Sequence, residues 1–145
     1  MTNIQEILNT TDRFAANAGC QVTEMDATHA VAEMTVTKEH LNAGGVCQGG
    51  ALFTLADLAM AALMNHQGNL TFGISSNVMF LSPAQEGDRL RAEAVPIANH
   101  RRIPSVEVRV TNQDGRLICH LTGMGYRKEV ALEKCTTDNN SAKEC

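Results

Sequence analysis

The stretch GGALFTLADLAMAALMN, from Gly49 to Asn65, decides the fold. Between positions 51 and 64 only Thr54 and Asp57 are not apolar, and the other residues are mostly Ala, Leu and Met, which favour helix. Because apolar side chains would occupy every side of this helix, we expect other structure to wrap it. The stretch is too short to span a bilayer. The sequence therefore predicts a buried central helix.

Asp57 is the one charged residue in this run. Its helical neighbours at three and four positions, Phe53, Thr54, Met60 and Ala61, include no cation. An unpartnered buried carboxylate costs on the order of several kcal/mol. The protein must therefore supply hydrogen-bond donors from another element, raise the carboxyl pKa or admit water. These conditions describe a general base or nucleophile, and equally a hydrogen-bonded or rim-exposed aspartate.

The composition fits one globular domain of 145 residues, 43% of them apolar. A formal net charge of −4 argues against nucleic acid or an anionic membrane surface as the main partner. The first residues, MTNIQEILNTTDRF, are polar and charged where a signal peptide needs an apolar run. We therefore expect a cytoplasmic protein with no nucleic-acid or membrane partner.

The five cysteines form an odd set with no CxxC pair, at positions 20, 47, 119, 135 and 145. This spacing predicts neither a disulfide framework nor a zinc site and is typical of a reducing compartment. Cys47 is placed in a loop like a nucleophile, but without a partner it is better interpreted as a small apolar filler. We expect no metal and no cofactor.

Six strands are predicted around the central helix. Apolar spacing predicts an N-terminal helix within residues 1–18, and period-two alternation and turn residues predict a hairpin over 20–36 and strands over 71–82, 89–95, 105–111 and 116–128. This order gives an α+β class, with an antiparallel sheet curled around the helix. Residues 1–128 form the predicted domain, and the polar segment 129–145 is predicted to be a disordered tail.

Edge strands and one flank of the helix would remain uncovered in such a fold, so we expect a dimer or a larger oligomer.

A glycine-rich loop, Gly44-Gly45-Val46-Cys47-Gln48-Gly49-Gly50, leads into the central helix. Glycines before a helix let a ligand reach backbone N–H groups at the positive end of the dipole, although such runs are more often plain turns. Asn42 and Gln48 can donate and accept hydrogen bonds there, or simply close the loop. Asp57 lies about 12 Å from Gly49 along a helix. If both act on one carbonyl group, they come from different subunits.

Other candidates carry weaker signals. Ser75 shares a strand face with Asn77 and Met79 and could hydrogen-bond a carboxylate, although strand serines are commonly structural. Arg101 and Arg102 form a small basic patch that could contact phosphate. A Ser-His-Asp hydrolase is disfavoured, because there is no GxSxG elbow and the five histidines are scattered.

The residues HLNAGGVCQGGALFTLADLAMAALMN resemble the hotdog-fold acyl-CoA thioesterases, specifically their phenylacetate-pathway (PaaI-like) group. That group is similar in its His-Leu-Asn, its Gly-rich segment and its Leu-Ala-Asp within a long buried helix, and the similarity extends over about residues 20–128. The resemblance implies a hotdog fold, an acyl-CoA substrate and a homodimer or a dimer of dimers.

The resemblance also implies roles for individual residues. Asp57 matches the catalytic carboxylate, which attacks the thioester or activates water. Gly49 matches the glycine whose N–H polarises the thioester oxygen, and Asn42 matches an asparagine that positions the reacting groups. Ser75 falls where some members have an assisting serine. The glycine and the carboxylate come from opposite subunits in that family.

Gln48 departs from the family pattern, which usually has His. Glutamine cannot gain a proton near neutral pH, so any role of that His in tuning Asp57 is lost. Two alternatives stay open: a silent hotdog protein that binds acyl-CoA, and a hotdog hydratase or dehydratase, which the departure weakens. Met60, Leu63, Met64 and Phe80 either line an acyl pocket or belong to the core.

Overall fold

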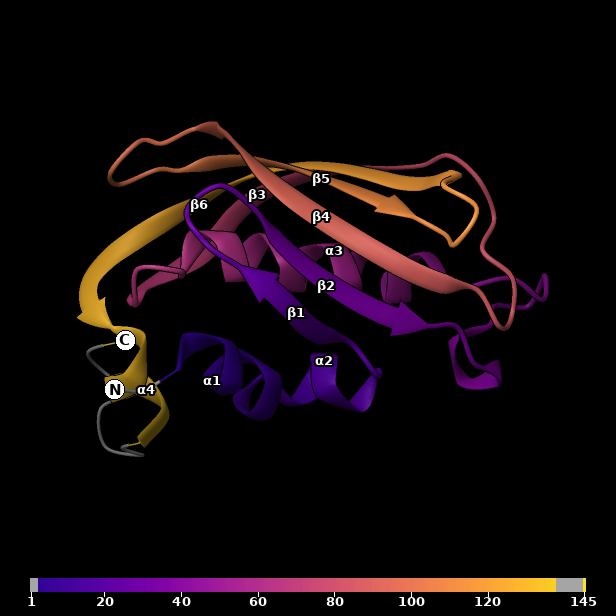
Figure 1. The fold of residues 1–145 in the computed structure, drawn as a ribbon, viewed down its shortest axis with the longest axis horizontal. Helices are drawn as coiled ribbons and strands as arrows, with labels where there is room; N and C mark the ends of the chain where they lie inside the picture. Colours follow the sequence, from indigo (N-terminus) through magenta and orange to yellow (C-terminus); the bar gives the residue numbers. More distant parts are fainter. Residues whose placement is uncertain (1–2, 138–144) are drawn as a thin grey trace.

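The computed structural model describes residues 3–137 and 145 (Figure 1). A six-stranded antiparallel sheet curves over one long helix, α3 (Gly49–Met64), and α1 (Ile4–Thr11) and α2 (Arg13–Asn17) lie beneath it. This confirms the predicted α+β class and the curved sheet around a central helix. Among the described residues, no helix is both long enough and apolar enough to cross a bilayer.

The strands follow one another in the sheet in the order β1-β2-β4-β5-β6-β3. Their bounds are β1 (Gln21–Met25), β2 (Ala30–Thr35), β3 (Asn69–Phe80), β4 (Arg89–Ala98), β5 (Ser105–Thr111) and β6 (Leu117–Ala131). The predicted hairpin pairs β1 with β2, and all neighbouring strands are antiparallel. Strand β3 therefore lies at one edge, with its pairing groups satisfied on one side only.

Helix α3 contributes much of the core, as its apolar sequence predicts. Its buried residues are Leu52, Leu55, Ala56, Leu58, Ala59, Met60, Ala62, Leu63 and Met64. The wrapping is incomplete in one chain, because a stripe through Gly50, Thr54, Asp57 and Ala61 is only half-buried or exposed. These positions recur every three to four residues, so they share one side of the helix.

The single predicted N-terminal helix is in fact two helices, because Asp12 interrupts it. The Asp12 N–H still bonds to the Leu8 carbonyl, but its carboxylate accepts the Ala15 N–H at 3.1 Å and caps a new helix. A side chain that caps a helix start offers the backbone an alternative to continuing the previous helix.

Ordered structure also continues past the predicted boundary at residue 128. Strand β6 runs to Ala131 and is followed by α4 (Leu132–Thr137). Leu132 is buried, and its N–H donates to the Gly68 carbonyl at 2.8 Å, which holds this segment on the domain. Residues 138–144 of the predicted tail lie outside the described residues. Cys135 and Cys145 form a disulfide, which the odd cysteine count did not predict.

Candidate active site

The loop before α3 is a small hairpin held by its own hydrogen bonds. The Gln48 N–H donates to the His40 carbonyl, and the Asn42 N–H donates to the Val46 carbonyl, both at 2.8 Å. The Asn42 side-chain oxygen accepts the N–H groups of Gly44 (2.9 Å) and Val46 (3.2 Å). Asn42 therefore shapes the loop, while its side-chain NH₂ donates to none of the residues that the structure describes.

Gln48 forms the N-cap of α3 and thereby shapes its first turn. Its side-chain oxygen accepts the Gly50 N–H at 2.9 Å, the bond that an N-cap residue normally makes. A Cβ at Gly50 would lie 2.5 Å from that oxygen, so glycine leaves the room that the cap needs. Within the described chain, the Gly49 N–H keeps no acceptor. This free donor at the positive end of the helix can stabilise a developing oxyanion.

Asp57 lies on α3 eight residues after Gly49, on the uncovered stripe. Its carboxylate has no hydrogen bond or ion pair with any described residue. Burial raises the pKa of the Asp57 carboxyl above its ordinary value, and the nearby charge of Asp12 raises this pKa further. A Cβ at Gly73 of β3 would lie 3.9 Å from the Asp57 Oδ1, so the carboxylate faces bare backbone there. A half-buried, unpartnered carboxylate can serve as a base or a nucleophile.

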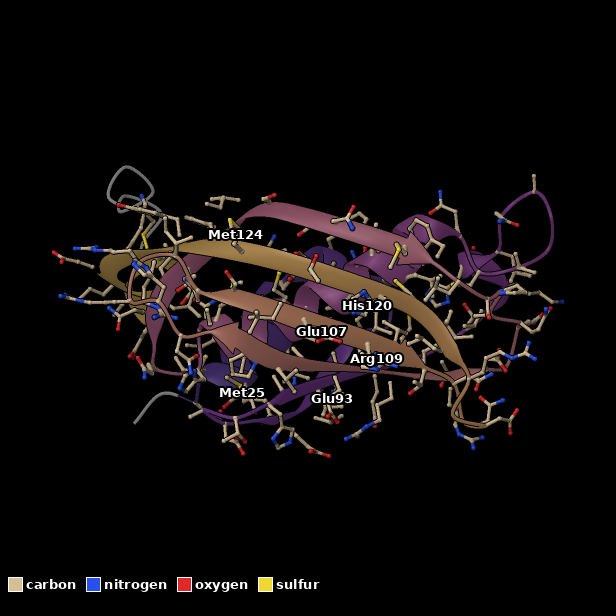
Figure 2. The ribbon with its side chains drawn as sticks, turned by 90° about the horizontal axis from the view of Figure 1, so that it is seen from above. Met25, Glu93, Glu107, Arg109, His120 and Met124 are labelled. Atoms are coloured by element: carbon tan, nitrogen blue, oxygen red, sulfur yellow. A yellow bond between two sulfur atoms is a disulfide. The ribbon has the colours of Figure 1, made fainter. Side chains whose placement is uncertain are left out.

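The structure does not bring Ser75 beside Asp57 in this chain. The register of β3 against β6 shifts between Gly73 and Ser75, and Ser75 then pairs with Met124. Figure 2 shows Met124 on the outer face of the sheet, turned away from α3. Cross-strand partners share a face, so Ser75 points outward with it. Ser76 has the inward position, because its Oγ would lie 3.1 Å from a Cβ at Gly123, which faces α3.

A cavity of about 710 Å³ lies beside the loop and the first half of α3. Its walls come from α2, from the loop and from the exposed side of α3, and they include Phe14, Ala18, His40, Asn42, Gln48, Gly50 and Thr54. Thr54 lies one helical turn before Asp57. The cavity therefore follows the stripe from Gly50 to Thr54, stops short of Asp57, and has the size of a small-molecule site.

The residues suggested for an apolar pocket divide into two groups. Met60, Leu63 and Met64 are buried in the core. Phe80 is 54% exposed and lines a smaller cavity of about 360 Å³ together with Asn42 and Gly49.

Arg101 and Arg102 lie between β4 and β5, next to β6. Arg102 pairs with Glu129, and the exposed Arg101 lies 3.8 Å from the same carboxylate. The structure adds Arg127, which the sequence did not single out. Its guanidinium donates to the carbonyls of Met64 and Arg101, both at 3.1 Å, and so connects this basic cluster with the end of α3.

Cysteine and metal chemistry gain no support from the geometry. Cys47 is buried, which agrees with its interpretation as a filler, and burial raises the pKa of its thiol to about 11. Such a thiol is protonated near neutral pH and is a poor nucleophile. Within the described part of the chain, no group of three His, Cys, Asp or Glu side chains is placed to hold a metal ion.

Sequence reasoning missed His40, whose ring bonds to Thr37 and to Ala18, the C-cap residue of α2. Its ring Nδ1 accepts the Thr37 N–H at 2.9 Å, and its Nε2 lies 2.6 Å from the Ala18 carbonyl oxygen. The one signal in the sequence was its place directly before Leu41 and Asn42, but the partner at Ala18 depends on tertiary contacts.

Comparisons with known proteins agree with this architecture. The chain matches the family model described as "Thioesterase superfamily" over residues 44–119. It is 33% identical to acyl-coenzyme A thioesterase PaaI of Escherichia coli, over 80% of this chain and 83% of that protein. The structure of E. coli PaaI, from the phenylacetic acid degradation operon, is similar with a TM-score of 0.83, at 30% identity over 87% of this chain and 91% of that chain. A variant of the phenylacetic acid degradation protein PaaI from Thermus thermophilus gives a TM-score of 0.76, at 31% identity over 81% of this chain and 100% of that chain.

Proposed function

Since the chain belongs to the thioesterase superfamily, in its PaaI-like group of hotdog thioester hydrolases, we propose that it hydrolyses acyl-CoA thioesters to the free acid and coenzyme A. The observation that carries this proposal is the unpartnered Asp57 carboxylate, with its raised pKa, on the uncovered stripe of α3. It is supported by a free amide at the start of the same helix.

In the proposed reaction Asp57 takes a proton from water, whose oxygen then attacks the thioester carbon. Alternatively, the carboxylate attacks this carbon itself and expels the thiolate of coenzyme A, and water then opens the resulting anhydride. Charge develops on the thioester oxygen, and the Gly49 N–H donates to it. In both routes the C–S bond breaks and coenzyme A leaves as the thiol, after its sulfur gains the proton held by Asp57 in the first route or a proton from solvent water in the second. Asn42 orients water or the acyl group with its free side-chain NH₂. No cofactor takes part besides the coenzyme A of the substrate.

The proposed site is shared by two chains of a homodimer. Gly49 and Asp57 lie on one helix, about 12 Å apart, too far to meet at one carbonyl group. Strand β3 offers a twelve-residue edge beside the uncovered stripe of α3, and its exposed apolar residues are Phe72, Ile74, Met79 and Phe80. A second copy paired along this edge would cover both features. The Gly49 amide of one chain would then face the partner's Asp57.

The coenzyme A phosphates are assigned to the basic cluster of Arg101 and Arg102. Both side chains line a small cavity of about 190 Å³ together with Arg127, which donates to the Met64 carbonyl at the end of α3. Guanidinium groups suit phosphate because they donate two hydrogen bonds in one plane.

The test of the function is thiol release from a panel of phenylacetyl-, benzoyl- and straight-chain acyl-CoAs. We expect wild-type turnover on at least one of these esters, and the preferred ester defines the acyl group. Binding without thiol release would contradict the proposal and favour a silent acyl-CoA-binding protein. Light scattering after size exclusion tests the shared site, because a mass of one chain would exclude it.

A further inference from the structure

His40 joins the two walls of the 710 Å³ cavity. Ala18, at the end of α2, lies in one wall, and Asn42 and Gln48 lie in the other. The His40 side chain bonds to Ala18, while its backbone carbonyl accepts the Gln48 N–H at 2.8 Å. His40 thus links the end of α2 to Gln48, the residue directly before Gly49.

The hydrogen bonds assign the tautomer of this ring. Nδ1 accepts the Thr37 N–H at 2.9 Å, so the proton of the neutral ring is on Nε2. Nε2 then donates to the Ala18 carbonyl at 2.6 Å. Ala18 is the C-cap residue of α2, where backbone carbonyls have no partner within the helix. A histidine donor is a common way to satisfy such a group.

The loop itself does not need this bond in order to close. Backbone bonds between His40 and Gln48 and between Asn42 and Val46 already form the hairpin. The Nε2 bond instead fixes where the hairpin lies relative to α2, across a separation of 22 residues. Small displacements of reacting groups cost rate steeply, on the order of 10²-fold for about 1 Å.

We propose that His40 is a positioning residue, which places the Gly49 amide for catalysis by tying its loop to the C-terminal end of α2. This inference rests on the proposed thioesterase function. His40 touches no reacting atom in the mechanism above, so its effect passes through the loop.

Two substitutions separate the two ring nitrogens. His40→Gln retains a donor near the place of Nε2 and loses both Thr37 contacts of Nδ1, the backbone N–H at 2.9 Å and the Oγ1 at 3.3 Å. His40→Asn retains an acceptor near the place of Nδ1 and loses the Ala18 bond. His40→Gln loses two contacts and His40→Asn loses one, so His40→Gln should lower Tm at least as much as His40→Asn. A merely structural residue would make activity follow Tm.

We expect His40→Asn to lower kcat about tenfold or more, with a smaller change in KM, because oxyanion stabilisation acts in the transition state. His40→Gln should restore kcat to within about threefold of wild type. Equal losses in the two variants, or a larger loss in His40→Gln, would overturn the proposal, as would no loss in either.

Amide hydrogen exchange gives a readout that needs no turnover. The Gln48 N–H should exchange faster in His40→Asn than in His40→Gln, because only the first variant frees the loop from α2. Equal exchange would overturn the positioning role even in an active enzyme. Absence of wild-type thiol release would instead contradict the proposed function, and the exchange comparison would still test the tie between the loop and α2.

Discussion

The loop of residues 40–48 and the middle of α3 carry the two halves of the proposed site, and they are built in opposite ways. The loop is crossed by hydrogen bonds through His40, Asn42 and Gln48, so its geometry is complete in one chain. Asp57 has no partner among the described residues and lies on an uncovered stripe. The oxyanion half is therefore preorganised, while the carboxylate half remains open for substrate and a second chain.

The largest effect on activity is expected from removing the charge of the Asp57 carboxylate. Asp57→Asn should lower kcat about 10²–10⁴-fold, as the loss of a general base or nucleophile does, in an assay of thiol release. The stability of the fold should not decrease. The raised pKa of Asp57 means that ionisation destabilises the fold as pH rises above the ordinary carboxyl pKa, and Asn removes this cost.

Thermal unfolding at pH 7 provides the control for this variant. Its Tm should equal or exceed that of wild type. A clearly lower Tm would show that the Asp57 carboxylate has a structural partner. The contrast between the hydrogen-bonded loop and an unpartnered carboxylate would then not hold.

The preorganised half is tested by removing one backbone donor. Gly49→Pro deletes the N–H at the first position of α3, where proline is well tolerated. The preceding Gln48 has φ −66° and ψ 140°, the extended conformation that a residue before proline adopts. We expect kcat to fall about 10²–10³-fold with little change in KM.

Gly49→Ala is the matched control, because it keeps the N–H and adds only a Cβ. That Cβ would lie 3.0 Å from the Phe80 ring, so a small loss through steric displacement is expected. If the two variants lost activity equally, the effect would come from bulk, and Gly49 would not be the oxyanion donor.

Combining the two variants tests whether the halves come from different chains. A mixed dimer of Asp57→Asn and Gly49→Pro chains contains one site with both wild-type groups and one site with neither. Random pairing after co-expression should restore about a quarter of wild-type activity, since half of the dimers are mixed and each has one working site. If each site lay within one chain, mixing would restore nothing.

The contrast between the two halves also explains what the sequence could predict. The central helix and the isolation of Asp57 follow from local composition, and the strands follow from their alternation. The outward turn of Ser75 does not, because an extra residue in β3 reverses the facing of side chains and leaves no mark in the pattern. The His40–Ala18 bond and the position of Arg127 depend on segments brought together only by folding.

A smaller effect is expected at the basic cluster, outside both halves. Replacing Arg101 and Arg102 together with Ala should raise KM for acyl-CoA severalfold and change kcat less, because phosphate contacts contribute equally to the ground and transition states. Steady-state kinetics with an acyl-CoA and with a truncated acyl-pantetheine thioester would check this, since the shorter ester lacks the nucleotide. An equal effect on both esters would remove these arginines from phosphate binding.

The smallest effect is expected from changing the charge near Asp57. Asp12, at the junction of α1 and α2, raises the Asp57 pKa by its charge. Asp12→Asn removes this charge but retains an N-cap oxygen for the Ala15 N–H. In the proposed mechanism Asp57 acts in its ionised form, so kcat/KM should fall as pH drops through its pKa, and a lower pKa should move this acid limb to lower pH. High salt should shrink the difference between variant and wild type, because it screens the charge. Superimposable profiles at low salt would show that burial alone sets the Asp57 pKa and that the charge of Asp12 does not influence the carboxylate.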